Sequence, residues 1–141
     1  KMLSYDESLK ILRETNALLE GHFILSSGLH SNQYVQCAKL LSYPKKAEII
    51  CAALTEKIKN KFNKIDIVLS PALGGIVVGY EIGKQLNIQT IFSERENASE
   101  RVQAYADKGF KIIYLTARNV YFQFNIPLFY PVTISQIEIF R

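Results

Sequence analysis

The strongest local signal in the sequence is a strand, a turn with two glycines and a helix in direct succession. Residues 65–69 are almost continuously apolar, as in a strand that is covered on both faces. Residues 70–75 interrupt this run with the pair Gly74-Gly75, and helical character returns over residues 76–86. A strand buried on both faces is typical of a parallel sheet with helices packed on each side.

Helices and strands alternate along the rest of the chain. A first helix is predicted over residues 4–20, with Ser4 as its N-cap and Gly21 as its stop. Two more helices are predicted over residues 44–61 and 98–109. The predicted extended segments are residues 23–25, 34–37, 89–92 and 111–116, with two further apolar segments within residues 126–140. The apolar stripes are Leu9, Leu12, Leu18 and Leu19 on the first helix, and Ala47, Ile49, Ile50, Ala53, Leu54 and Ile58 on the second.

This alternation predicts an α/β fold, with a mostly parallel twisted sheet flanked by helices. A small N-terminal helix and a hairpin, joined by a Ser/Gly/Asn turn, are expected to form a hood or flap. The length of 141 residues is that of one domain. Within it, residues 1–42 hold the helix and flap and residues 43–141 the α/β core, without an internal repeat or linker.

Composition and charge exclude several classes of protein. No apolar run approaches the ~18–20 residues that span a bilayer, and acidic residues near the N-terminus argue against a secretion signal. Cys37 and Cys51 lie among apolar neighbours, which favours reduced, buried thiols in a cytoplasmic protein. The net charge of +4 fits either nucleic acid or a small phosphate ester as ligand. The basic run at residues 57–64 contains only one aromatic residue, Phe62, and favours a solvated helix face.

Three polar or glycine-rich segments each follow a predicted strand. The Gly74-Gly75 turn lets the backbone approach a ligand, and the next helix directs unpaired N–H groups toward an anion. Arg95 follows the second strand and suits a bidentate contact with phosphate, and Arg118 follows the third. We expect the three segments to share one crevice, because parallel strands end at one edge of a sheet. Taken singly, the glycines fit a plain tight turn and the charged cluster around Arg95 a surface ion-pair network.

The two histidines, His22 and His30, are not expected to form a metal site, because neither has a cysteine or carboxylate at ligand spacing. His30 is expected at the surface of the hairpin turn rather than as a catalytic base. The sequence has no Walker loop, dinucleotide-binding fingerprint, GxSxG, HExxH or CxxC motif.

Several motifs, in order along the chain, resemble the orotate phosphoribosyltransferase family. They read GHFILSSGLHS at residues 21–31, YVQC at residues 34–37, SPALGGIVVGYE at residues 70–81 and FSERE at residues 92–96. The tail resembles the family's late helix, strand and closing segment through VQAY at residues 102–105, GFKIIYLTARN at residues 109–119 and FNIPLF at residues 124–129. The resemblance implies a type I phosphoribosyltransferase fold.

A segment that the family carries is absent between Asn97 and about Arg101. There the family has a basic catalytic loop, then a strand that ends in two acidic residues and a Thr/Gly-rich loop for the ribose 5-phosphate. No adjacent acidic pair followed by Thr-Thr-Gly occurs in this sequence. The chain is either a degenerate homologue or a sequence from which this segment is missing. We favour the second interpretation, because losing a central strand should leave a hole that costs more than a typical net stability of about 5–15 kcal/mol.

The resemblance implies transfer of ribose 5-phosphate from phosphoribosyl pyrophosphate (PRPP) to N1 of orotate, giving orotidine 5′-monophosphate and pyrophosphate. It implies Mg2+ as cofactor and a homodimer as assembly, while no residue of this chain is assigned as a metal ligand or catalytic group. The residues implied to bind substrates are Ala72, Gly74, Gly75 and Arg95 for the pyrophosphate group, Arg118 for orotate, and Ser26, Tyr34 and Val35 in the flap over the base. The alternatives are a purine phosphoribosyltransferase, a PRPP- or nucleotide-binding protein without catalysis, and, least favoured, a nucleic-acid-binding module.

Overall fold

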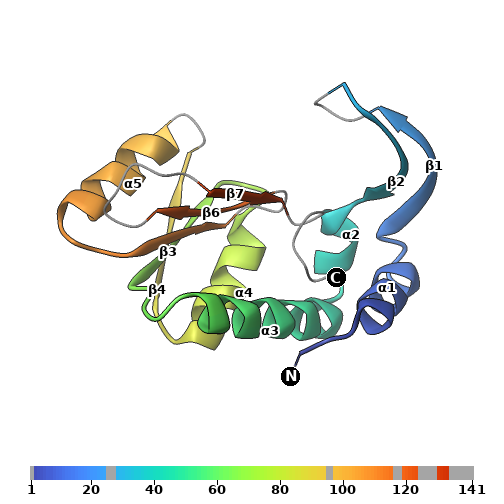
Figure 1. Ribbon diagram of the computed structural model, residues 1–141, viewed down its shortest axis with the longest axis horizontal. Coiled ribbons are helices and arrows are strands. Elements are labelled where there is room, and N and C mark those ends of the chain that lie inside the picture. Colours follow the sequence, from blue (N-terminus) through green and yellow to red (C-terminus); the bar gives the residue numbers. More distant parts are fainter. Residues whose placement is uncertain (1, 25–27, 95–96, 116–118, 124–129, 134–141) are drawn as a thin grey trace.

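The computed structural model describes residues 2–24, 28–94, 97–115, 119–123 and 130–133. Its helices are α1 (Tyr5–Glu14), α2 (Cys37–Leu41), α3 (Pro44–Lys61), α4 (Ile76–Leu86) and α5 (Ala98–Asp107). Its strands are β1 (Leu18–Ile24), β2 (His30–Val35), β3 (Ile67–Pro71), β4 (Gln89–Ser93), β5 (Ile112–Leu115), β6 (Asn119–Gln123) and β7 (Tyr130–Thr133). Strands β1 and β2 form a separate antiparallel hairpin, which extends away from the main sheet at the opposite end of the molecule from α5 (Figure 1).

The main sheet has five strands in the order β4-β3-β5-β6-β7. Strand β3 pairs in parallel with β4 and β5, whereas β6 pairs antiparallel with both β5 and β7. Four of the five strands therefore run in the same direction, and the predicted α/β fold with a mostly parallel sheet is confirmed. The antiparallel strands at the β7 edge were not predicted. There the connections are too short for the crossover helix that a parallel pair requires.

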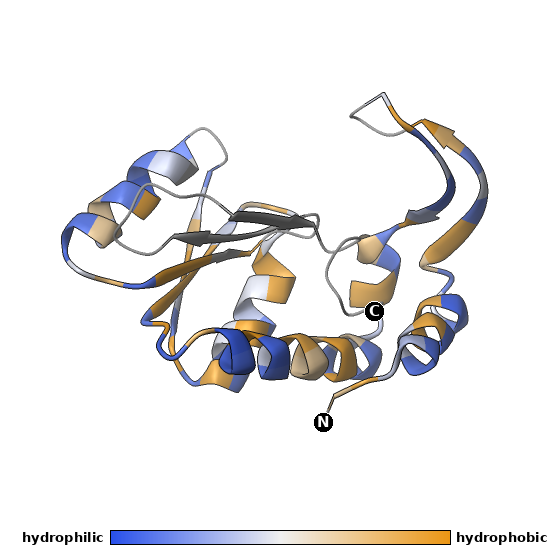
Figure 2. Cartoon of the chain, in the orientation of Figure 1, coloured by the Kyte–Doolittle hydropathy of each residue, from blue (hydrophilic) through white to orange (hydrophobic). Residues whose placement is uncertain are grey.

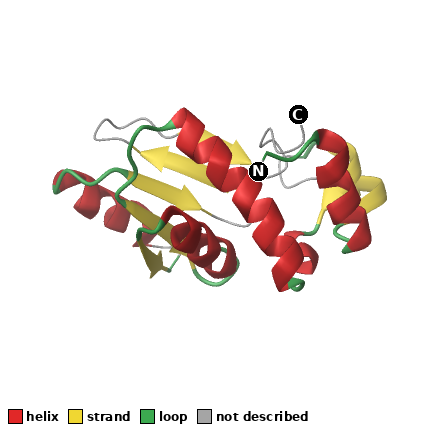
Figure 3. Ribbon diagram, turned by 90° about the horizontal axis from the view of Figure 1, so that it is seen from below, coloured by secondary structure: helices red, strands yellow, loops and turns green. Residues whose placement is uncertain are grey.

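Helices cover both faces of the sheet, as the continuous apolar run of β3 predicted (Figure 3). Val68 belongs to a core cluster with residues of α3 and α4, whereas its neighbours Ile67 and Leu69 pack in a second cluster with α5. Successive side chains of a strand point to opposite faces, so a strand between two helical layers needs apolar residues at every position. Figure 2 shows these apolar residues on β3 and along α3, which carries hydrophilic residues between them.

The N-terminal helix is shorter than predicted, although its start is correct. The Ser4 side chain accepts a hydrogen bond from the Glu7 N–H, and the Glu7 side chain accepts one from the Ser4 N–H, forming a capping box. The helix ends at Glu14, because Asn16 takes a left-handed conformation at φ 54° and turns the chain. The predicted stripe residues Leu18 and Leu19 therefore lie in β1. The expected stop, Gly21, lies inside the same strand, where the pairing register with β2 shifts.

The second predicted helix is confirmed over all of its length, with Pro44 in its first turn. One member of its predicted buried side is wrong, since Ile49 is 43% exposed. The cysteines also differ from expectation in part. Cys51 is buried and Cys37 is only half-buried, and the two do not form a disulfide. No helix in the described ranges is long and apolar enough to cross a membrane.

The expected hole in the sheet is absent, because β3 pairs directly with β5. The pairs are Ile67 with Ile112, Val68 with Ile113, and Leu69 with Tyr114. Ile112, Ile113 and Leu115 are buried, so the late strand supplies the apolar faces that a central position requires. Strand β5 is thus the direct neighbour of β3, and the described sheet has no gap between them.

Asp66 joins the start of β3 to the start of β5. Its Oδ2 accepts a hydrogen bond of 2.8 Å from the Lys111 N–H, and its Oδ1 lies 3.2 Å from Lys64 Nζ. The hydrogen bond from Lys111, with a smaller contribution from Lys64, holds the pKa of Asp66 below its ordinary value of 3.8. The ionised form is therefore favoured in the folded state.

We expect Asp66→Asn to lower the free energy of unfolding at pH 7, because the folded state then loses a stabilised carboxylate. A lowered folded pKa contributes stability above the unfolded pKa and loses it as the pH falls through the folded value. The difference in unfolding free energy between the variant and the wild type should therefore shrink below about pH 3.8, which is the pKa of this carboxyl group in the unfolded chain. Urea unfolding at pH 7 and pH 3 measures this. The same change at exposed Asp107 should have a smaller effect at both pH values, and an equal deficit for Asp66→Asn at both would contradict the assignment.

Candidate functional site

Three strands end together at one edge of the main sheet. Strands β4, β3 and β5 are adjacent and parallel, and Pro71 and Ser93 are register partners at the ends of β3 and β4. The end of β5, at Leu115, lies on the other side of β3. The three strands therefore end at one edge, as predicted, whereas the shared crevice of the segments that follow them stays a prediction. The side chains of Arg95 and Arg118, which follow β4 and β5, lie outside the described residues.

The turn between β3 and α4 is anchored to β4 and remains open to solvent. The Ala72 N–H donates to the Ser93 carbonyl at 2.8 Å, and the Gly75 N–H donates to the Pro71 carbonyl at 3.0 Å. The Ala72–Leu73 peptide bond is cis. Leu73 is 84% exposed and Gly74 is exposed, so the middle of the turn faces solvent while both of its ends are fixed.

Gly75 lies where no side chain fits. A Cβ atom at this position would lie 2.7 Å from Pro71 Cδ and 2.8 Å from the carbonyl oxygen of Leu115. Backbone atoms cannot yield as the end of a flexible side chain can. The second glycine of the predicted pair is therefore required for close packing of the turn against both β3 and β5. This requirement favours neither interpretation of the pair by itself, because a tight turn and a ligand cradle both need it.

The first turn of α4 begins at this edge, where the Ile76 N–H already donates to the Leu73 carbonyl at 3.2 Å. Gly75 is the N-cap and has no side chain that could accept a hydrogen bond from the N–H groups of this turn. The first N–H groups of a helix have no intrahelical acceptor, and the helix dipole adds partial positive charge at the same end. A phosphate or carboxylate group is the ligand that such an end of a helix binds. The strand edge thus has the chemistry of an anion site.

Two buried hydroxyl groups near this edge were not identified from the sequence. Ser70 and Ser93 are 0% and 4% exposed, and no described group hydrogen-bonds either Oγ atom. Ser70 packs against α4, since a Cβ on Gly79 would lie 1.8 Å from Ser70 Oγ. Ser93 ends β4, and its carbonyl holds the turn. The only sequence feature that could have indicated these buried hydroxyl groups is a small polar residue near the end of an apolar strand.

The flap residues have other described contacts. The Tyr34 ring lies 5.8 Å from the Phe23 ring, centroid to centroid, within the β1–β2 hairpin. Val35 packs against the main core cluster. These contacts attach the base of the hairpin to the core, but they do not place Tyr34 or Val35 against the turn. Ser26 lies outside the described residues.

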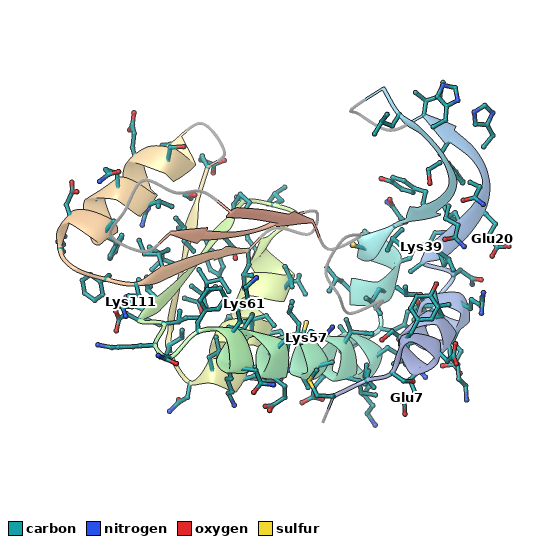
Figure 4. The ribbon with its side chains drawn as sticks, in the orientation of Figure 1. Glu7, Glu20, Lys39, Lys57, Lys61 and Lys111 are labelled. Carbon is teal, nitrogen blue, oxygen red and sulfur yellow. The ribbon has the colours of Figure 1, made fainter. Side chains whose placement is uncertain are left out.

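Among the residues that the structure describes, the lysines are spread over several elements. Figure 4 shows the labelled lysines spread from Lys39, beside the hairpin, through Lys57 and Lys61 on α3, to Lys111 before β5. Lys61 lies over the Phe62 ring at 5.8 Å from its centroid. This distribution matches the predicted solvated helix face better than a continuous nucleic-acid surface.

Solved structures with a similar fold define the class of this chain. It superposes on the crystal structure of orotate phosphoribosyltransferase from Aeropyrum pernix with a TM-score of 0.54 and 24% identity, covering 62% of this chain and 52% of that one. It superposes on the structure of Leishmania donovani UMP synthase with a TM-score of 0.55 and 22% identity, covering 65% of this chain and 21% of that one. The fold is that of the type I phosphoribosyltransferases.

Two curated relatives carry the name orotate phosphoribosyltransferase. The orotate phosphoribosyltransferase of Caldicellulosiruptor bescii is 46% identical over 110 residues, which are 78% of this chain and 55% of that protein. That of Caldicellulosiruptor saccharolyticus is 48% identical over 104 residues, which are 74% and 51% of the two chains. The chain is thus similar to orotate phosphoribosyltransferases over about three quarters of its length, and it spans about half the length of the curated relatives it matches. No family model matches the sequence.

Proposed function

We propose that the chain transfers ribose 5-phosphate from PRPP to N1 of orotate, as the names of its relatives indicate for those proteins. The observation that carries the proposal is the identity of 46–48% to orotate phosphoribosyltransferases over about three quarters of this chain. The strand edge supports it, because the Ala72–Gly75 turn and the α4 N-terminus have the chemistry to bind a diphosphate group. Purine bases are the nearest alternative acceptors within the same fold.

The proposed roles follow the order of the segments along the edge. The turn of Ala72, Gly74 and Gly75 holds the pyrophosphate group at its exposed middle, around Gly74, because the N–H groups of Ala72 and Gly75 donate to the carbonyls of Ser93 and Pro71. Arg95 neutralises the charge of that group. Arg118 pairs with the carboxylate or ring oxygens of orotate. Ser26, Tyr34 and Val35, in the hairpin, cover the base. The reaction then needs no covalent nucleophile, because positive charge develops on the ribose C1′ while the anionic leaving group is stabilised in place.

Metal, assembly and compartment are part of the same proposal. The described residues contain no group of three or more His, Cys, Asp or Glu that could hold a metal ion. Mg2+ is therefore proposed to enter with the pyrophosphate group of the substrate, since this ion is commonly held through substrate phosphates. A homodimer in the cytoplasm is proposed from the family likeness, and two cysteines that form no disulfide are compatible with a reducing compartment.

The activity is tested by mixing the protein with PRPP, Mg2+ and orotate and following the loss of orotate. We expect orotidine 5′-monophosphate and pyrophosphate in equal amounts, and no product with adenine or hypoxanthine. Arg118→Ala should raise the KM for orotate by about 10-fold or more, the cost of losing a hydrogen bond to a charged group. The KM for PRPP should stay near the wild-type value. Unchanged orotate kinetics would refute the role of Arg118.

A second candidate is a PRPP- or nucleotide-binding protein without catalysis. It is favoured by the direct pairing of β3 with β5 and by the absence of an adjacent acidic pair followed by Thr-Thr-Gly. Calorimetric titration with PRPP separates the candidates. Binding without turnover of any base supports this second candidate, turnover of orotate supports the first, and neither binding nor turnover contradicts both.

A further inference from the structure

The two histidines of the chain meet on the hairpin, although eight positions separate them in the sequence. His22 Nε2 lies 2.6 Å from His30 Nδ1, and the ring centroids are 4.8 Å apart. His30 is the register partner of Ile24, and His22 lies two residues before Ile24 on β1. The register of β1 against β2 shifts between Glu20 and Phe23, and the two imidazoles meet across the hairpin beside this irregularity. The sequence-based expectation was that the two histidines form no metal site, since neither has a cysteine or carboxylate at ligand spacing, and it did not include their contact across the hairpin.

The geometry is close to that of a bound metal ion. Zn–N bonds of about 2.0–2.1 Å at tetrahedral angles place two ligand nitrogens about 3.3 Å apart. The nitrogens of His22 and His30 already face each other. If the distance between them increases by less than about one ångström, an ion fits between them. Both side chains are exposed, so water can complete the coordination sphere. Without metal, one ring donates its N–H to the other.

The ligand type selects the class of metal. Imidazole nitrogen suits Zn2+, Cu2+ and Ni2+, whereas Mg2+ prefers oxygen ligands and retains its water. This site is therefore different in chemistry from the Mg2+ expected with PRPP. An ion held by both rings links β1 to β2, and a two-stranded hairpin is only marginally stable by itself.

We propose that His22 and His30 form a two-histidine site for a divalent transition metal, and that the bound ion clamps the β1–β2 hairpin. The proposal does not depend on transferase activity, so either can fail without the other. Thiols compete poorly, because burial raises the pKa of Cys51 to about 12 and keeps that thiol protonated at neutral pH. Cys37 is half-buried and has to be tested as the other source of a soft ligand.

The test is calorimetric titration of the whole chain with ZnCl2 at neutral pH, in a buffer that does not bind zinc. We expect one zinc ion per chain and no comparable signal with MgCl2. His22→Gln and His30→Gln should each weaken binding by more than the roughly 10–100-fold that loss of an outer-shell partner costs. Amide hydrogen exchange should slow in β1 and β2 when zinc is bound, and this slowing should disappear in both variants.

Two control variants separate this site from other zinc ligands. Gln33→Ala changes an exposed residue of the same hairpin, and Cys37→Ser removes the accessible thiol; both should bind zinc as the wild type does. Failure of the wild-type chain to bind zinc, equal binding by the doubly substituted His22→Gln/His30→Gln chain, or loss of binding in Cys37→Ser would each overturn the proposal.

Discussion

Gly75→Ala is expected to reduce kcat/KM for PRPP by about 100-fold, the scale of a one-ångström displacement of a binding group. A Cβ at this position would lie 2.7 Å from Pro71 Cδ and within 2.9 Å of the carbonyl oxygens of Leu115 and Pro71. The turn has to move as a unit, because its backbone is hydrogen-bonded to β3 and β4 at its two ends. The N–H groups at the α4 N-terminus then no longer point to one place.

Initial-rate kinetics with varied PRPP, together with urea unfolding, measure this effect. Overpacking should also cost about 1–3 kcal/mol of stability. Leu73→Ala is the matched control, because it shortens a side chain that is 84% exposed in the same turn. That variant should stay within about 0.5 kcal/mol of wild type. Should Gly75→Ala turn over PRPP as efficiently as Leu73→Ala, the turn does not hold the pyrophosphate group.

The second large effect is expected inside the core, where Gly79→Ala should destabilise the fold by about 3 kcal/mol. The added Cβ would lie 1.8 Å from Ser70 Oγ and 2.7 Å from Ser70 Cβ, so rotating the serine hydroxyl does not remove the overlap. Helix α4 would have to move away from β3. Chemical denaturation, followed by circular dichroism, gives the free energy of unfolding.

A double-mutant cycle identifies the cause. Ser70→Ala alone should be neutral or stabilising, because the buried Ser70 Oγ has no described hydrogen-bond partner. Adding Ser70→Gly to Gly79→Ala should recover part of the loss, with a coupling energy in the range of about 0.5–3 kcal/mol found for residues in contact. Additive effects of the two substitutions would show that the glycine has another role. Val77→Ala, on the exposed side of α4, serves as the control for helix propensity.

The direct pairing of β3 with β5 bears on how the chain can bind PRPP. The family resemblance puts an acidic strand and a Thr/Gly-rich loop between these segments, yet Val68 and Ile113 are register partners and both fully buried. The turn proposed for the pyrophosphate group lies between Pro71 and Gly75. For the ribose 5-phosphate, the sequence contains no copy of the family's loop. Turnover without that loop would therefore require contacts that differ from those implied by the resemblance.

Local patterns predicted the elements whose environment is uniform along their length. The continuous apolar run of β3 identified a strand between two layers, and Pro44 with its apolar periodicity located α3 from end to end. Prediction failed where one residue overrides a pattern. The leucines of residues 18 and 19 continue the helical stripe of α1, but Asn16 ends the helix before them. Ile49 fits the stripe of α3 by spacing and still lies at its exposed margin.

The sequence by itself determined the class of fold and the glycine turn. A strand that is buried on two faces requires consecutive apolar residues, and a close backbone contact requires glycine, so both can be recognised from residue types in one segment. Tertiary structure alone decided which distant groups meet. The contact of Gly79 with Ser70 depends on how α4 lies on the sheet, and the meeting of His22 with His30 depends on the register of β1 against β2. Register and strand order arise from packing between segments, and the spacing of residues within one segment does not predict them.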